Sequence, residues 1–62
     1  MLTVKTIIHH KRKDTVKTKH FNNSFKCLNY AEKVSKRKKV VSANVYIGND
    51  LEYIYIKGET LL

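Results

Sequence analysis

Three tyrosines in the last third of the chain have the residue type and spacing to bind nucleobases. Tyr46, Tyr53 and Tyr55 alternate with other side chains, and alternate residues of a β-strand point to opposite faces of its sheet. If Asn49 and Asp50 are the central residues of a hairpin turn, Tyr46 lies opposite Tyr53, and Tyr55 shares their face. Because bases stack on aromatic rings, this tyrosine face is a candidate platform for single-stranded nucleic acid.

Two other interpretations of the tyrosine face stay open. Tyrosine is a good strand former, and cross-strand tyrosine pairs stabilise an exposed sheet without binding anything. Tyrosine is also enriched at protein interfaces, so the same face could dock a protein or a second copy of the chain. The spacing of the tyrosines therefore predicts an aromatic sheet face and does not decide whether it binds nucleic acid, a protein or nothing.

The charge of the chain favours a polyanionic partner. Thirteen Lys and Arg against five Asp and Glu give a formal net charge of +8, which attracts nucleic acid, acidic proteins or anionic lipid. Eleven of the basic residues are lysine, which binds phosphate as a point charge, whereas arginine is the usual reader of guanine. The excess of lysine over arginine predicts contact with the phosphate backbone of nucleic acid, although an AT-rich genome would encode the same composition. The predicted strand pairings place four lysines with the tyrosines, namely Lys5, Lys17, Lys19 and Lys57.

Two short basic clusters add further candidate phosphate contacts. They are Lys11, Arg12 and Lys13 in the first cluster, and Lys36, Arg37, Lys38 and Lys39 in the second. The second cluster lies at the end of a predicted helix, where positive charge also complements the helix dipole, so plain solvation is the alternative. The predicted topology leaves open whether the two clusters are neighbours.

Catalysis and metal binding are not expected. His9 and His10 are adjacent in a strand and point to opposite faces, His20 lies at the far end of the same hairpin, and Cys27 is predicted to be buried. The acidic residues are scattered, and the two glycines form no phosphate-binding loop. The sequence therefore predicts no catalytic residue, no metal ligand and no cofactor.

The elements that must position these residues follow from hydrophobic periodicity. Residues 2–10 and 15–21 alternate as strands, with Ile8 placed opposite Val16, and residues 40–57 form the second hairpin. Between the hairpins, three candidate N-caps at 22–24 precede apolar residues at helical spacing, which predicts a helix over 24–38.

The order strand, strand, helix, strand, strand predicts a two-layer α+β fold, ββαββ. One helix packs on one face of a four-stranded antiparallel sheet of order 2-1-3-4. The tyrosines and lysines lie on the uncovered face. The predicted core is Leu2, Val4, Ile8, Val16, Leu28, Ala31, Val34, Val41, Val45, Ile54 and Ile56.

Length and composition predict a single domain over residues 1–62, in which residues 58–62 either form a flexible tail or pack back over the sheet. Residues 1–5 lack the pattern of a signal peptide, and no apolar run approaches the roughly 18 residues of a transmembrane helix. A lone cysteine also suits a reducing compartment. We therefore expect a cytoplasmic protein with no membrane partner.

The leading expectation is a small non-catalytic protein that binds single-stranded DNA or RNA through its lysines and the tyrosine face. The alternative is a protein-interaction module that docks on an acidic host protein or forms a homodimer through the same face. In layout, length and Lys/Asn-rich composition the chain resembles many small proteins of phages and mobile elements, a resemblance that would fit an effector or inhibitor.

Overall fold

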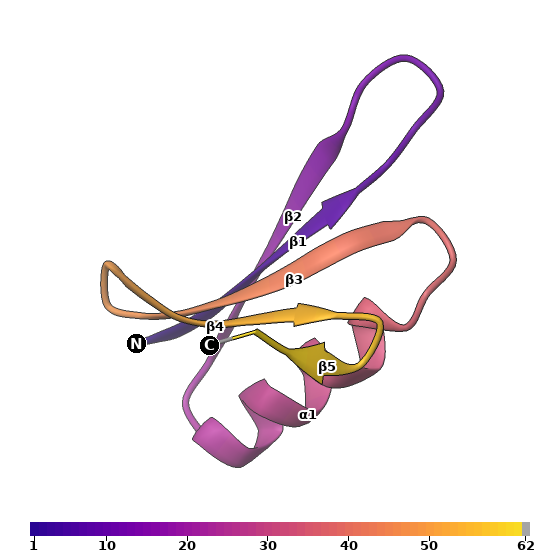
Figure 1. The fold of residues 1–62 in the computed structure, drawn as a ribbon. Helices are drawn as coiled ribbons and strands as arrows, with labels where there is room; N and C mark the ends of the chain where they lie inside the picture. The colour runs from indigo at the N-terminus through magenta and orange to yellow at the C-terminus, as the bar shows by residue number, and fades with distance from the viewer. Residues whose placement is uncertain (62) are drawn as a thin grey trace.

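One helix packs against one face of an antiparallel sheet in the computed structural model, which describes residues 1–61 (Figure 1). The sheet has five strands in the order β2-β1-β3-β4-β5. The α+β class and the predicted order of the first four strands are confirmed, and the fifth strand was not predicted. The elements are β1 (Leu2–Ile8), β2 (Thr15–Phe21), α1 (Ser24–Ser35), β3 (Val40–Ile47), β4 (Asp50–Ile56) and β5 (Glu59–Thr60).

The fifth strand forms because the chain turns sharply after β4. Lys57 and Gly58 both have positive φ, at 52° and 86°, and they return the chain alongside β4. The Leu61 amide then donates a hydrogen bond of 2.9 Å to the Ile54 carbonyl. The segment 58–61 thus extends the edge of the sheet, while Leu62 lies outside the described residues.

The helix begins as its capping residues predict and ends earlier than expected. Asn23 is the N-cap, and its side chain accepts a hydrogen bond of 3.1 Å from the Lys26 amide. The helix ends at Ser35, three residues before the predicted end, and the next residues form a turn in which the Val40 amide donates to the Arg37 carbonyl. The second basic cluster therefore lies in a turn and not on a helix.

The β1–β2 hairpin pairs one residue away from the predicted register. Ile8 lies opposite Thr15 instead of Val16, and a one-residue shift reverses the face of every side chain in the strand. This register places the ring of Phe21 on the helix side of the sheet, where it packs on Tyr30 with ring centroids 5.3 Å apart. Val16 is turned to the uncovered face, where it is 57% exposed.

The β3–β4 hairpin also departs from the predicted register, by two residues at the turn and by one residue from Val45 onward. Gly48 has φ +63° and occupies the turn, so that Ile47 pairs with Asp50. A register shift between Val45 and Tyr46 then inserts one extra residue into β4, and Val45 pairs with Tyr53 instead of Ile54. From Tyr53 to Ile56 the faces of β4 are therefore the reverse of those predicted.

The core lies between α1 and the sheet, and its fully buried apolar residues are Val4, Cys27, Ala31, Val34, Val40, Ala43 and Val45. Four predicted core residues are wrong, namely Val16, Val41, Ile54 and Ile56. Val16, Ile54 and Ile56 lie on the uncovered face because of the two shifted registers. Val41 is displaced by an irregularity in the β1–β3 pairing, which places Val40 opposite Ile8. In residues 1–61, no helix is long and apolar enough to span a membrane.

Candidate nucleic-acid interface

The tyrosine face predicted from the sequence does not form. Tyr46 lies on the uncovered face, whereas Tyr53 and Tyr55 pair with Val45 and Ala43 and lie on the helix side of the sheet. The rings of Tyr53 and Tyr55 pack at a centroid distance of 6.5 Å, and burial, then the Glu32 carboxylate, raises the pKa of Tyr55. A platform of three tyrosines on one open surface is therefore excluded, because the extra residue in β4 separates them.

Lys5 occupies the uncovered face, as predicted. Its Nζ lies 4.8 Å from the centroid of the Tyr46 ring, which is a cation–π contact. The two side chains border a hollow of about 230 Å³ in which His20 Nδ1 lies 3.0 Å from the Thr3 hydroxyl. Lys5 is the one lysine that the strands present on this face within residues 1–61, so the face is only weakly basic.

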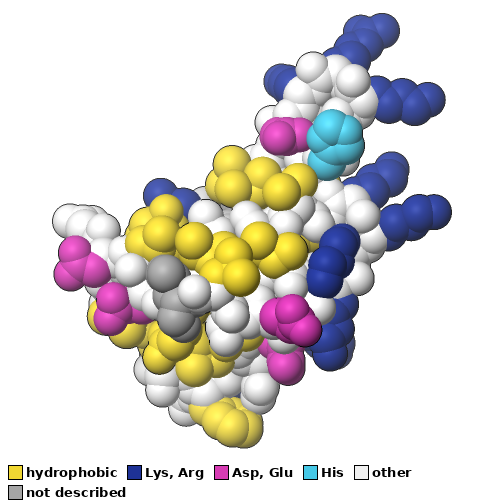
Figure 2. All heavy atoms as spheres, viewed as in Figure 1, with side chains coloured by type: hydrophobic (Ala, Val, Ile, Leu, Met, Phe, Trp, Pro, Cys, Tyr) yellow, Lys and Arg dark blue, Asp and Glu magenta, His cyan; other side chains and the backbone are white. Residues whose placement is uncertain are grey.

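The two basic clusters come together at one end of the sheet. The His9 amide donates a hydrogen bond of 2.7 Å to the Lys39 carbonyl, which joins the start of the β1–β2 loop to the turn before β3. The hairpin tip projects beyond the other strands in Figure 1, and Figure 2 shows dark-blue side chains at this tip and below it. We call this surface the basic flank. It consists of Lys11, Arg12, Lys13, Lys36, Arg37, Lys38 and Lys39, all exposed.

Lys57 has a different role from the predicted one. Its Nζ donates to the Arg37 carbonyl at 3.0 Å and to the Val40 carbonyl at 3.1 Å. The next residue, Gly58, donates its amide to the Ser35 hydroxyl at 2.9 Å. Lys57 thus fastens the β4–β5 turn to the turn that carries the second basic cluster, and it belongs to the support of the basic flank.

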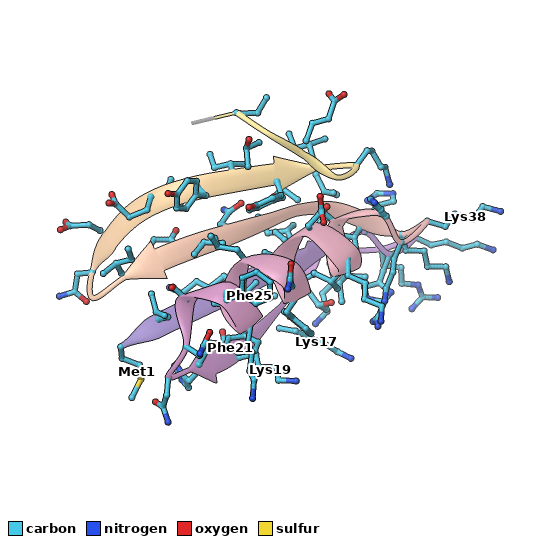
Figure 3. All side chains as sticks on the ribbon, turned by 90° about the horizontal axis from the view of Figure 1, so that it is seen from below. Met1, Lys17, Lys19, Phe21, Phe25 and Lys38 are labelled. Atoms are coloured by element: carbon cyan, nitrogen blue, oxygen red, sulfur yellow. The ribbon has the colours of Figure 1, made fainter. Side chains whose placement is uncertain are left out.

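Lys17 and Lys19 lie on the helix side of β2 and not with Tyr46, because of the shifted β1–β2 register. Figure 3 shows them with Phe21 along the strand beside α1. On the helix, the contact of Tyr30 with Phe21 identifies the side that faces β2. The helical spacing of residues 26, 30 and 33 puts Lys26 and Lys33 on that same side.

We call this second surface the lysine surface, and it consists of Lys17, Lys19, Lys26 and Lys33. The prediction missed Lys26 and Lys33, and it also missed the aromatic pair Phe21 and Tyr30 that lies among the four lysines. The signal was present in the sequence, because Lys26, Tyr30 and Lys33 form a stripe at helical spacing that runs beside the apolar one.

None of the five acidic residues lies in β2 or on the side of α1 that faces β2. Asp50 and Glu52 lie in β4, Glu59 in β5, and Glu32 on the side of α1 that faces Tyr55. The fifth acidic residue, Asp14, is 2.8 Å from the Nδ1 of His9 in the β1–β2 loop. The lysine surface therefore has no carboxylate among its own side chains to neutralise it.

Nothing in the described residues resembles a metal centre or a reactive thiol. No group of three His, Cys, Asp or Glu side chains converges anywhere in residues 1–61. Cys27 is fully buried, and this burial raises the pKa of its thiol, which disfavours the reactive thiolate. Comparisons of the chain with protein-family models, curated proteins and solved structures give no match. The basic flank and the lysine surface are therefore the features of the chain from which a function can be inferred.

Proposed function

We propose that the chain is a small non-catalytic protein that binds nucleic acid through the phosphate backbone. The observation that carries this proposal is the hydrogen bond from His9 to Lys39, because it joins two basic clusters that are far apart in the sequence. Seven basic side chains then converge on one flank, and the lysine surface continues the positive charge along β2 and α1. Phosphate contacts by lysine provide affinity without sequence specificity.

The proposal places the protein in the cytoplasm, where nucleic acid is available and a single thiol stays reduced. The binding surface differs from the one predicted from the sequence, since the basic flank and the lysine surface replace the tyrosine face. The contacts expected are those of lysine and arginine with phosphate oxygens. Their strength comes largely from the release of counterions condensed on the polymer.

Fluorescence anisotropy of labelled DNA and RNA oligonucleotides tests this function. We expect micromolar or tighter binding at 50 mM salt and a loss of roughly 10³-fold or more by 200 mM if at least six phosphates are contacted. The slope of log K against log salt then gives the number of phosphates in contact. Absence of binding to every oligonucleotide at low salt would exclude the proposed function.

A protein-interaction module is the second candidate, and the uncovered sheet face favours it. Val16, Ile56 and Leu61 are 57%, 38% and 63% exposed, and the open face carries the single lysine Lys5. Two copies could therefore meet through this face with little repulsion. Size-exclusion chromatography with light scattering should report a dimer in this case, and Val16→Asp should convert it to a monomer. A monomer at high micromolar concentration would argue against this second candidate.

A further inference from the structure

We propose that the polymer bound is single-stranded and that one of its bases stacks on the ring pair of Phe21 and Tyr30. This inference rests on the proposed function and adds a defined position to it. It differs from the tyrosine platform predicted from the sequence in both its residues and its place. The platform would lie on the uncovered sheet face, whereas this pair lies between β2 and α1.

Both rings are half-buried against the core, and a cation stands over the part that stays open to solvent. The ring planes are inclined by 46°, with centroids 5.3 Å apart. The Nζ of Lys19 lies 4.7 Å from the centroid of Tyr30 and 5.5 Å from that of Phe21. Lys19 is an exposed residue, so an ammonium group that borders solvent covers the part of the two rings that the core leaves open.

The surroundings distinguish this pair from the other aromatic residues. The four lysines of the lysine surface surround it, and no acidic side chain belongs to that surface. Tyr53 and Tyr55 lie instead on the side of α1 that carries Glu32, whose carboxylate would repel a phosphate. Phe25 is 73% exposed but lies on a different side of α1 from Tyr30, away from β2. Phe21 and Tyr30 are half-buried, and the part of their rings that stays open to solvent lies beside side chains that can bind phosphate.

A single strand fits this arrangement better than a duplex. The faces of bases inside a duplex are covered by their neighbours, and only their edges and the backbone can be reached. An unpaired base can take the place of the Lys19 ammonium over the rings, and Lys19 can then bind the adjacent phosphate. After this exchange the Lys19 ammonium group still has an ionic partner, the phosphate, and the base gains stacking on an aromatic ring.

Three labelled probes of equal length test the inference: an oligothymidine strand, a chain of abasic deoxyribose phosphates, and a duplex of the same length. The first two carry the same number of phosphates and differ in their bases. We expect the abasic chain to bind roughly fivefold to 150-fold more weakly than oligothymidine, which is the effect of one stacked base. Equal affinity of these two probes would overturn the inference and leave the proposed function intact, whereas absence of binding to all three would overturn both.

Variants locate the stacked base. Tyr30→Leu keeps an apolar side chain and should reduce oligothymidine binding to the level of the abasic chain, whereas the matched control Tyr46→Leu should leave the ratio of the two affinities unchanged. Tyr30→Trp provides a second measurement that does not remove the ring. Its indole emission should be quenched by oligothymidine and not by the abasic chain, and identical emission with both probes would contradict the assignment.

Discussion

Replacing Arg12, Arg37 and Lys38 together by glutamine is expected to weaken nucleic-acid binding by roughly 100-fold at 0.1 M salt. Each phosphate contact to a single strand contributes about 0.7 to the slope of log K against log salt, so three lost contacts lower the slope by about 2. All three side chains are exposed. The fold should therefore be unchanged, and circular dichroism checks this alongside the anisotropy titration.

Two matched single substitutions test whether binding depends on where a positive charge lies or only on the total charge of the chain. Lys38→Gln removes one charge from the basic flank, and Lys5→Gln removes one from the uncovered sheet face. We expect only Lys38→Gln to change the salt slope, by about 0.7. If the slope of log K against log salt fell by the same amount in both variants, the net charge of the chain and not the basic flank would govern binding.

The second large effect is expected in the core, where Val45→Thr should destabilise the protein by about 1–3 kcal/mol. Val45 is 1% exposed, and the new hydroxyl group would be buried among apolar side chains. For a domain of this size each kcal/mol lowers the melting temperature by about 4–8 °C. Because a domain of this size buries a smaller fraction of its surface than a larger domain does, its total stability is low and this loss is a large part of it. Thermal unfolding followed by circular dichroism measures the change.

Val16→Thr is the matched control for this substitution. Both residues were expected in the core from the sequence, but Val16 is 57% exposed on the uncovered face. Thr and Val have similar strand propensity, so Val16→Thr should alter the free energy of unfolding by no more than about 0.5 kcal/mol. A cost at Val16 equal to that at Val45 would show that the β1–β2 hairpin pairs in the register predicted from the sequence.

The fold class was predictable because it depends on periodicity, which is a local property of the sequence. The spacing of Cys27, Ala31 and Val34 identified the helix, and the alternation of apolar residues identified the first four strands. The registers were not predictable, because they depend on side chains distant in sequence. The contact between Phe21 and Tyr30 accompanies the one-residue shift of the β1–β2 hairpin. In the β3–β4 hairpin, the pairing of Ile47 with Asp50 and the extra residue in β4 together change the register.

The basic clusters of the candidate site were predictable because they are local features of the sequence, whereas their arrangement in space was not. The two basic clusters are runs in the sequence, but only the pairing of β1 with β3 brings His9 to Lys39. The prediction of the tyrosine face depended on the β3–β4 register, and it was wrong because that register differs from the predicted one. Lys17 and Lys19 were assigned to the wrong side, while the register that placed them beside α1 also created the lysine surface that includes Lys26 and Lys33.

The position of Asp50 and Glu52, at the end of the sheet away from the basic flank, has a consequence for the rate of encounter with a polyanion. The basic flank lies at one end of the sheet, and the carboxylates of Asp50 and Glu52 lie beside the β3–β4 turn at the other end, which gives the molecule an electric dipole in addition to its net charge. A polyanion therefore exerts a torque on the approaching protein and turns the basic flank toward itself. Preorientation of this kind raises the fraction of productive collisions, and it acts on association and not on the lifetime of a complex.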